Sequence, residues 1–382
     1  MMYSFSEVLG QQKVKDRLLR SVQEERVPHA MLFNGAEGHG ALALAMAMSK
    51  YLLCANPNES DACHECTSCK AIHSLQHPDL HFSFPFFNKS GSSTEHTLSD
   101  DFGEEWRELL LSTCYFNTEY WVSKISKENK LLHFPVYEAN NIARKLSLKS
   151  FYGGKKVMII WMAELIKEDT ANKLLKLLEE PPANTIFILV TESTESMLAT
   201  VVSRVQSIQI PKIEDDVVTH YLIQLGIEPE RAQMSAAFSN GNLWKAVLFA
   251  QNENFNQGLD DAFQTWMRLC YKKDLFQLSE MGITFHSWGR EVQKQFFEYG
   301  LEQVRQNLLK NYVGDEILHM TDSEKAFAEK FSKFINHFNA EDLMNELTDA
   351  AYHIGRNLNA KLLFSHLSIK VHHLLRRNQY AN

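Results

Sequence analysis

The sequence predicts an α/β domain built on a parallel sheet, followed by a C-terminal part made only of helices. Short apolar runs that are typical of buried strands alternate with helical patterns as far as residue 210. After Pro211 the sequence shows helical patterns and no convincing strand. Its 382 residues are enough for two or three domains. We therefore expect a parallel sheet with helices on both faces, ahead of two all-α domains.

The strands expected in the sheet are short apolar runs at residues 29–33, 157–160 and 185–190, with 207–210 as a further candidate. Apolar residues at helical spacing predict helices at residues 14–23, 41–53 and 170–180. Pro181 and Pro182 end the last of these helices, because proline cannot continue a helix.

Residues 86–135 fit neither pattern. They include a Ser/Gly/Thr-rich stretch and an acidic stretch, yet they also contain the aromatic residues Trp106, Phe116, Tyr120 and Trp121. We interpret this segment as a partly ordered insertion, since a disordered linker would be poor in aromatic residues.

The C-terminal part reads as helices throughout. Three short helices are expected at residues 215–225, 230–238 and 243–251. Longer helices begin near residue 258 and end in an amphipathic run from about 341 to 377, with an apolar face at Leu358, Leu362, Leu363 and Leu367 and a basic end at Lys370, His372, His373, Arg376 and Arg377. That apolar face suits core packing and an interface equally, and the basic end suits a solvated helix terminus better than a DNA site. The predicted domains are therefore residues 1–212, 213–256 and 257–382.

Acidic residues outnumber basic ones, with 47 Asp+Glu against 39 Lys+Arg and a formal net charge of −8. This balance argues against a protein that coats nucleic-acid phosphates with its whole surface, and it leaves local basic patches open. The first residues, MMYSFSEVLG, show no signal-peptide pattern, and no apolar stretch is long enough to cross a bilayer. We expect a cytoplasmic protein with no membrane partner.

Four of the six cysteines are clustered, with the spacing C-x8-C-x2-C-x2-C: Cys54, Cys63, Cys66 and Cys69. Four thiolates at such short spacings can close a tetrahedral zinc site. A site closed in this way has no position for a catalytic water, so we expect a structural Zn²⁺ in a module spanning residues 54–69. Free thiols and an iron–sulfur cluster are the alternatives.

Residues 35–42 have the setting of a phosphate-binding loop without its chemistry. They follow an expected strand and open an expected helix, and the glycines Gly35, Gly38 and Gly40 suit the pattern G-x-x-x-x-G-K-[ST]. Ala41 stands in place of the lysine that neutralises phosphate, and Leu42 in place of the hydroxyl that holds magnesium. A chance glycine-rich turn is the alternative to a degenerate loop.

The acidic residues that an ATPase needs for magnesium are also missing from their expected position. ATPases of this kind carry acidic residues at the end of the next core strand, where this chain has Trp161-Met162 followed by Ala163-Glu164. Loss of the lysine, the hydroxyl and both acids argues against ATP hydrolysis and leaves nucleotide binding open.

Together these segments resemble the bacterial DNA polymerase III clamp-loader subunits of the AAA+ class. Besides the glycine loop and the cysteines, the resemblance rests on Val8-Leu9-Gly10-Gln11, Pro28-His29-Ala30, His77-Pro78-Asp79, the LLKLLEEPP run at 174–182, and Ser203-Arg204. It covers about residues 5–84 and 136–252, and more loosely the helical part that follows. It implies an AAA+ core over 1–212, a helical lid over 213–256 and a helical collar over 257–382.

Within that family the chain is most similar to the delta-prime type, which has a decayed nucleotide site. The resemblance implies a non-hydrolysing stator beside ATP-binding motor subunits and the delta subunit in a hetero-pentamer, which opens the sliding clamp and places it on primed DNA. It also implies that Arg204 is an arginine finger completing a neighbour's ATP site in trans, oriented by Ser203. A solvated surface arginine is the alternative.

Three departures from the family pattern stand out. Val205 replaces the cysteine that follows Ser-Arg in the family, and Trp244 and Lys245 stand where motor subunits carry a sensor arginine. The insertion at 86–135 has no counterpart. The alternatives to a stator are an ATP-hydrolysing motor subunit of the gamma/tau type and an AAA+-derived interaction protein.

Overall fold

The computed structural model describes residues 3–88, 97–126, 131–251, 253–288, 290–312, 320, 322–355 and 358–377. The chain forms two compact units. The first comprises Met1–Leu225 and Ser239–Ala246, and the second comprises Gly226–Phe238 and Val247–Asn382. The division into three domains stays a prediction.

A five-stranded sheet of order β2-β3-β4-β1-β5 forms the centre of the first unit. Its strands are β1 (Ala30–Asn34), β2 (Leu80–Ser83), β3 (Lys156–Trp161), β4 (Thr185–Thr191) and β5 (Gln206–Gln209). Every pairing is parallel; Ala30 of β1 lies opposite Phe187 of β4, and Met31 lies opposite Gln206 of β5. The predicted α/β class with a parallel sheet is confirmed.

The strand β2 is the one strand of the described sheet that the sequence pattern missed. His81 and Phe82 are only half-buried, because β2 lies at the edge of the sheet and pairs with β3 alone. An edge strand needs no continuous apolar run, so its pattern is weak.

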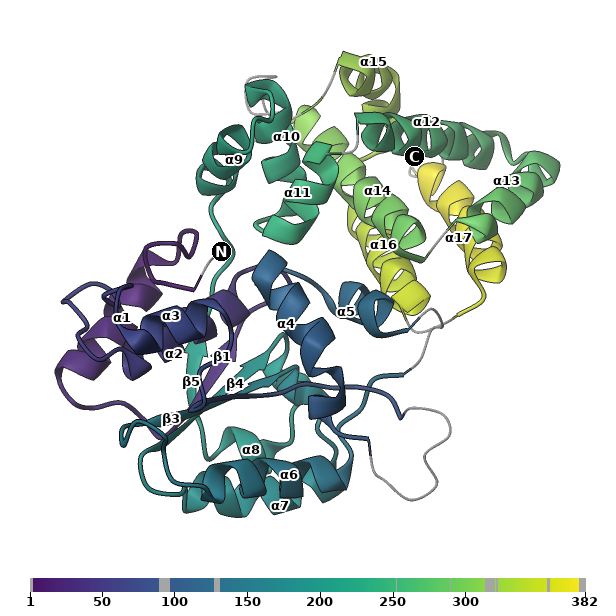
Figure 1. Cartoon of the computed structure of the whole chain (residues 1–382). Helices are drawn as coiled ribbons and strands as arrows, with labels where there is room; N and C mark the ends of the chain where they lie inside the picture. Colours follow the sequence, from purple (N-terminus) through teal and green to yellow (C-terminus); the bar gives the residue numbers. More distant parts are fainter. Residues whose placement is uncertain are drawn as a thin grey trace. The chain divides into compact units, whose positions relative to one another are not determined.

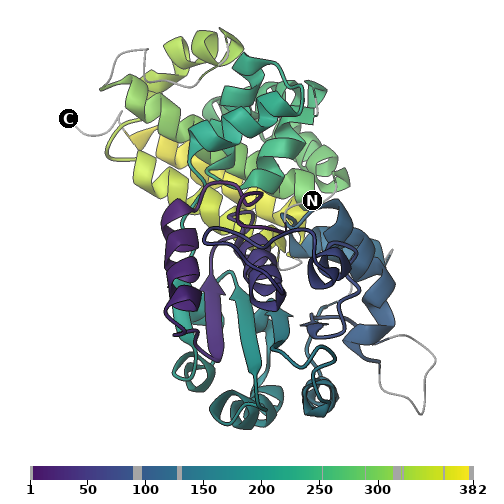
Figure 2. The ribbon, with the colours of Figure 1, turned by 60° about the vertical axis from the view of Figure 1, so that its left-hand side comes forward.

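Helices cover both faces of the sheet (Figures 1 and 2). They are α1 (Gln12–Gln23), α2 (Ala41–Leu53), α3 (Thr67–His73), α6 (Val136–Ser147), α7 (Glu168–Glu179) and the short α8 (Ala199–Val202), with one-turn helices η2 (Ala163–Leu165) and η3 (Thr194–Ser196). The helix α9 (Asp215–Gln224) follows β5 in the chain and ends the first part of this unit. Leu32, Ile160 and Leu189 pack in one cluster with α6 and α7. The alternate strand residues point to the opposite face, where α2 contacts β1, β3 and β4.

The described part of the predicted insertion contains helices and an antiparallel bridge between Phe86 and His133. It contains η1 (Ser99–Phe102), α4 (Gly103–Ser112) and α5 (Thr118–Ile125). Trp106 and Trp121 are 3% and 0% exposed, so this segment has a packed interior. Residues 89–96 and 127–130 of the insertion lie outside the described residues.

Helices alone form the second unit among the residues described. They are α10 (Pro229–Ser239), α12 (Glu253–Lys272), α13 (Leu275–Ser287), α14 (Arg290–Lys310), α15 (Asp322–Phe331), η5 (Ser332–Phe334), α16 (Ala340–Gly355) and α17 (Ala360–Leu375); α11 (Leu243–Gln251) begins in the first unit and ends in this one. Large aromatic side chains fill its core, among them Phe263, Trp266, Phe296 and Phe364.

The single amphipathic run expected from about 341 to 377 is wrong, because the structure divides it into α16 and α17. The side chain of Asn359 caps the second helix by accepting a hydrogen bond from the backbone N–H of Leu362 at 3.2 Å. An N-cap begins a new helix, so an asparagine inside a long apolar pattern was the signal. The expected apolar face also splits, since Leu367 is buried whereas Leu362 is 69% exposed.

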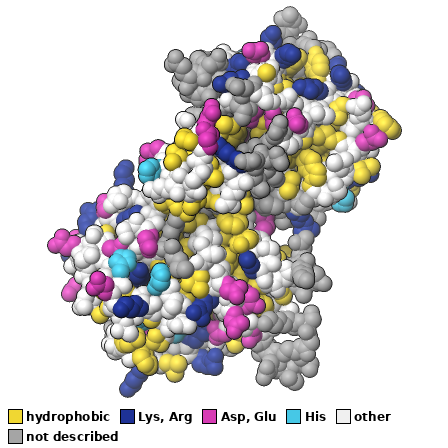
Figure 3. Space-filling model, turned by 45° about the horizontal axis from the view of Figure 1, so that its top comes forward, with side chains coloured by type: hydrophobic (Ala, Val, Ile, Leu, Met, Phe, Trp, Pro, Cys, Tyr) yellow, Lys and Arg dark blue, Asp and Glu magenta, His cyan; other side chains and the backbone are white. Residues whose placement is uncertain are grey.

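Charges of both signs are interspersed over the face shown in Figure 3. This distribution agrees with the modest net charge of −8. Within the described residues, no helix has both the length and the apolar character that crossing a bilayer requires.

Candidate functional site

The four clustered cysteines meet in space. Their sulfur atoms all lie within 4.8 Å of one another. The distances from Cys54 Sγ are 3.4 Å to Cys63 Sγ and 4.0 Å to Cys66 Sγ, and Cys63 Sγ lies 3.9 Å from Cys69 Sγ. A tetrahedron of thiolates at the usual zinc–sulfur bond length has sulfur atoms about 3.8 Å apart. The donor set and its spacing therefore fit Zn²⁺.

Two helices hold these thiols in place. Cys54 follows the last residue of α2, and Cys66 is the N-cap of α3, where its sulfur accepts from the backbone N–H of Cys69. The sulfur of Cys63 accepts from the backbone N–H of Cys66 at 3.4 Å. Backbone hydrogen bonds from Cys66 and Glu65 lower the pKa of Cys63 to about 6, which favours the thiolate that binds metal.

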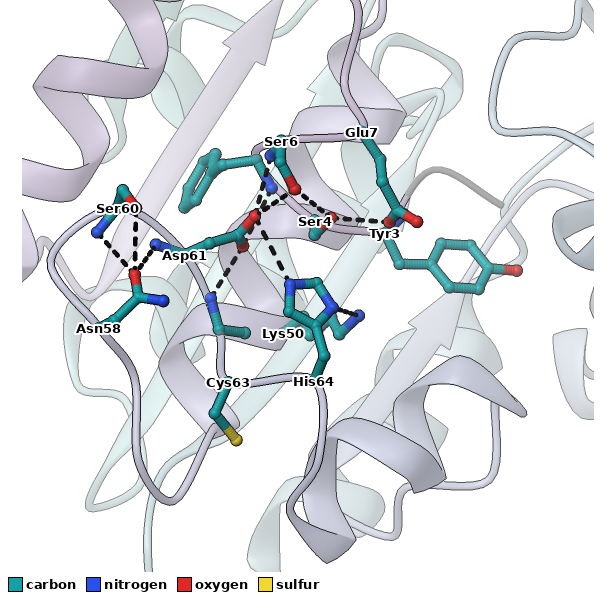
Figure 4. A network of polar contacts seen from close by, with 12 residues as sticks. Tyr3, Ser4, Ser6, Glu7, Lys50, Asn58, Ser60, Asp61, Cys63 and His64 are labelled. Atoms are coloured by element: carbon teal, nitrogen blue, oxygen red, sulfur yellow. Dashed lines mark hydrogen bonds and ion pairs between the residues drawn. The ribbon is translucent and has the colours of Figure 1, made fainter.

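Asp61 ties the thiol module to the start of the chain (Figure 4). Its carboxylate accepts hydrogen bonds from the backbone N–H groups of Phe5 and Ser6 at 3.2 and 2.9 Å, and from the Ser6 hydroxyl at 2.7 Å. Burial opposes ionisation of Asp61, but the hydrogen bonds from Ser6 and its neighbours outweigh it and lower the pKa of this carboxyl. Sequence reasoning missed Asp61, although its place two residues before Cys63 was a signal.

The glycine loop lies between β1 and α2, as the sequence predicts. Gly38 and Gly40 have φ angles of +74° and +94°, a conformation that glycine adopts without strain. Both glycines also face close neighbours. A Cβ atom on Gly38 would lie 1.9 Å from Asn242 Oδ1, and one on Gly40 would lie 2.9 Å from Cε1 of Tyr115. Ala41 and Leu42, at the positions where a phosphate-binding loop carries its lysine and hydroxyl, are buried.

The position at the end of β3 where ATPases carry an acidic residue is occupied by Trp161. Trp161 is 4% exposed and lies against Phe116, with ring centroids 5.1 Å apart. The nearest acid in sequence, Glu164, accepts a hydrogen bond from the backbone N–H of Glu192 at 2.9 Å. Burial raises the pKa of Glu164, although the hydrogen bond from Glu192 opposes the shift.

Arg204 lies just after α8, beside the C-terminal end of α7. Its Nε lies 2.5 Å from Oε1 of Glu179, which belongs to the LLKLLEEPP run. Its Nη1 donates to the backbone carbonyl of Thr200 at 2.8 Å and to the hydroxyl of Ser203 at 3.3 Å. Among the described residues the structure shows no partner for Nη2, and the side chain is 33% exposed. The guanidinium is thus positioned from one side and open on the other.

The structure does not bring the three predicted sites together. The glycine loop and the thiols lie at opposite ends of α2, which spans about 20 Å. The glycine loop follows the last residue of β1, whereas Arg204 precedes the first residue of the parallel neighbour β5. The glycine loop therefore lies at the C-terminal ends of the strands, and Arg204 lies at their N-terminal ends. Arg204 is badly placed to contact a ligand bound at the glycine loop of its own chain.

Comparison with known proteins gives a consistent result. A family model described as DNA polymerase III, delta subunit, matches residues 10–214. DNA polymerase III subunit delta' of Bacillus subtilis (strain 168) is 26% identical over 311 residues, covering 80% of this chain and 79% of that protein. The delta' subunit of Escherichia coli (strain K12) is 27% identical over 241 residues, covering 63% and 60%.

Two further matches are weaker, one because it covers a smaller part of the matched protein and the other because its sequence identity is lower. DNA polymerase III subunit gamma/tau of Mycoplasma genitalium is 25% identical over 260 residues, but these make up only 36% of that protein. Among solved structures, a DNA polymerase III gamma subunit-related protein from Thermotoga maritima is 13% identical, with a TM-score of 0.37 over 96% of this chain and 100% of that one.

Proposed function

Because the chain belongs to the DNA polymerase III delta subunit family, we propose that it is a non-hydrolysing, delta-prime-type stator of a clamp loader. In this role it joins the ATP-binding motor subunits and the delta subunit in a hetero-pentamer. The complex loads the sliding clamp onto primed DNA, and the chain is a component of the polymerase holoenzyme. The observation that carries the proposal is a glycine loop without phosphate-binding or metal-binding side chains, in a chain that keeps Ser203-Arg204.

The gamma/tau alternative is less well supported. A motor subunit needs a cation for the phosphates and a carboxylate for magnesium. In this chain Ala41, Leu42 and Trp161 stand at those positions, and all three are buried. The match to the Bacillus subtilis delta' subunit also covers much more of that protein than the gamma/tau match covers of its own.

Arg204 is proposed to complete the ATP site of a neighbouring motor subunit. Arg204 lies at the N-terminal ends of the strands, whereas the glycine loop lies at their C-terminal ends, and this position supports a role in trans. Glu179, Ser203 and the carbonyl of Thr200 hold Nε and Nη1, which leaves Nη2 to meet a phosphate oxygen. Glu179 would hold the arginine ready until the neighbour's nucleotide competes for it.

The test is reconstitution with motor subunits, delta subunit, clamp and primed DNA, comparing wild type with Arg204→Ala. Hydrolysis at the adjacent site should fall by about 1,000-fold, because an arginine finger stabilises charge that develops in the transition state. Single-turnover ATP hydrolysis and clamp loading measure the effect. Lys176→Ala, which removes an exposed cation from the same helix as Glu179, is the matched control. Unchanged hydrolysis and loading in Arg204→Ala would remove the finger role.

The four-thiol module is proposed to hold a structural Zn²⁺. When bound, the ion supplies the cross-link that a short segment without a core of its own needs to fold. Cys54 and Cys63 would fix the loop between them, and Cys66 and Cys69 would fix the start of α3. Asp61 would then anchor the module to the N-terminal segment.

A further inference from the structure

The insertion at 86–135 packs where a nucleotide would have to bind. In an open parallel α/β sheet, ligands bind outside the carboxyl ends of the strands. In this chain the relevant ends are those of β1, which leads into the glycine loop, and β3, which ends at Trp161. Residues 113–121, which comprise the connection after α4 and the first turn of α5, contact both.

At the end of β1, Tyr115 covers the glycine loop. A Cβ atom on Gly40 would meet its ring at 2.9 Å and its hydroxyl oxygen at 3.2 Å. The hydroxyl also accepts a hydrogen bond from the backbone N–H of Leu9 at 3.2 Å. The backbone N–H of Tyr115 in turn donates to Oγ1 of Thr113 at 3.0 Å, which fixes the turn that presents the ring. Tyr115 is 3% exposed.

At the end of β3, aromatic side chains of the insertion cover Trp161. The ring centroids of Phe116 and Trp106 lie 5.1 and 5.3 Å from that of Trp161. Trp121 packs edge-to-face on Trp106 at 5.2 Å, and its Nε1 donates to the carbonyl of Pro85 at 2.9 Å. All four aromatic residues are at most 5% exposed. The place where magnesium ligands would stand is an aromatic core.

The insertion also contacts the start of α11, at residues 242–244, which lies against the glycine loop. The backbone N–H of Leu243 donates to the carbonyl of Gly38 at 3.2 Å, and Asn242 Nδ2 donates to Glu37 Oε1 at 3.0 Å. The ring of Trp244 lies 4.6 Å from that of Tyr120. One short segment therefore joins the glycine loop, the end of β3 and residues 242–244.

We propose that residues 113–121 are a built-in occupant of this crevice, which closes it to nucleotides and holds the glycine loop and the start of α11 at residues 242–244 together. Bound nucleotide would have to displace the buried ring of Tyr115. This inference rests on the proposed function in one respect, which is that the glycine loop is a former phosphate-binding loop. It gives the insertion a specific role, as the internal replacement for a ligand.

The first test measures nucleotide binding to the purified full chain. The probe is N-methylanthraniloyl-ATP with magnesium, and its fluorescence reports binding. Wild type should show no saturable binding at millimolar probe. Ala41→Lys, which restores the phosphate-binding cation, should also fail to bind while Tyr115 remains. Saturable binding by wild type, or by Ala41→Lys with Tyr115 in place, would overturn the occlusion.

The second test is amide hydrogen exchange in the same chain. Tyr115→Ala should increase exchange by tenfold or more in residues 35–40 and 242–244, while Tyr115→Phe, which keeps the ring, should increase it at Leu9 alone. Tyr152→Ala, which removes a half-exposed tyrosine elsewhere on the first unit, should change neither segment. Equal exchange in Tyr115→Ala and wild type would refute the proposal. These outcomes do not depend on Arg204, so the stator role stands or falls separately in the reconstituted complex.

Discussion

Single carboxylates fix the loops around the sheet. Asp79, from the His77-Pro78-Asp79 motif, accepts hydrogen bonds from the backbone N–H groups of Phe151 and Tyr152 at 2.8 and 3.2 Å, and from the Ser150 hydroxyl at 3.1 Å. Asp61 holds the N-terminal segment in the same way. A carboxylate that accepts several backbone N–H groups satisfies donors that would otherwise lie unpaired. These residues thus shape the surface loops.

Glu138 is a buried carboxylate whose ionisation should affect stability. It accepts hydrogen bonds from the Ser99 backbone N–H and hydroxyl and from the Ser83 hydroxyl, linking α6 to η1 and β2. Burial raises its pKa, although the hydrogen bonds from Ser99 and Ser83 oppose the shift. A carboxyl with a raised folded-state pKa contributes stability below its unfolded pKa and loses it as pH rises through the folded pKa.

We therefore predict that wild type loses stability relative to Glu138→Gln as pH rises above the ordinary glutamate range. Urea unfolding at about pH 4.5 and about pH 7.5 measures the difference in unfolding free energy between the two proteins. This difference should favour wild type more at the lower pH. Glu180→Gln, at an exposed glutamate, is the control and should show no such trend. A pH-independent difference for Glu138→Gln would contradict the assignment.

At the scale of elements, the segment between α2 and α3 depends on its cysteines. In the described residues it contains no regular helix or strand from Cys54 to Cys66. Apart from the hydrogen bonds of Asp61 and Asn58, the close approach of four thiols is its main organising feature. A metal that binds only the folded module adds its binding free energy to folding.

We predict about one Zn²⁺ per chain by metal analysis, lost in Cys63→Ser and in Cys69→Ser. Chelation should increase hydrogen exchange in α3 while the sheet stays protected, since the metal cross-links only this module. Cys114→Ser is the matched control, because Cys114 is buried and lies outside the thiol cluster. Stoichiometric zinc in Cys63→Ser would exclude the four-cysteine site.

The C-terminal helix is held within its own unit by its basic end. Lys370 pairs with Glu346 of α16 at 2.5 Å, Arg377 pairs with Asp342, and the buried His372 lies 2.8 Å through Nδ1 from the carbonyl of Cys270. The expected solvated helix terminus is therefore corrected for His372. Each exposed ion pair contributes only about 0–1 kcal/mol, so apolar packing of Phe364 and Leu367 supplies most of the helix's stability.

At the scale of the whole molecule, the proposed assembly needs a surface on the helical unit. The aromatic core of that unit is complete without Leu358 and Leu362, which are 50% and 69% exposed on or beside α17. Exposed apolar side chains that the core does not need are available for contact with another protein. This face of α17 is a concrete place to test for subunit contact.

We predict that Leu362→Asp weakens association with the motor and delta subunits by about tenfold or more, since a carboxylate in a contact surface would be desolvated without a partner. Its unfolding midpoint should equal that of wild type. Leu367→Asp is the contrasting variant and should lose about 3 kcal/mol or more of stability, because a carboxylate would enter the core. Size-exclusion chromatography and thermal unfolding measure the two effects. Unchanged assembly of Leu362→Asp would remove this surface.

The sequence by itself determined the order of α/β and all-α parts, most strand positions and the four clustered cysteines that are proposed to hold Zn²⁺. These features depend on local periodicity, on proline and glycine, and on short spacings along the chain. The same residues showed that the glycine loop lacks its lysine and hydroxyl. They could not show β2, whose edge position leaves a weak pattern, or the division between α16 and α17.

Only the tertiary structure decided what surrounds each candidate site. It placed Tyr115 against Gly40, Phe116 against Trp161, and Glu179 beside Arg204. These pairs are 25 to 75 residues apart in the sequence. Aromatic residues in an insertion indicate that it packs, but the surface on which they pack follows from the folded path of the chain. For that reason the sequence alone could not indicate the proposed role of the insertion, which depends on its contacts with the glycine loop and the end of β3.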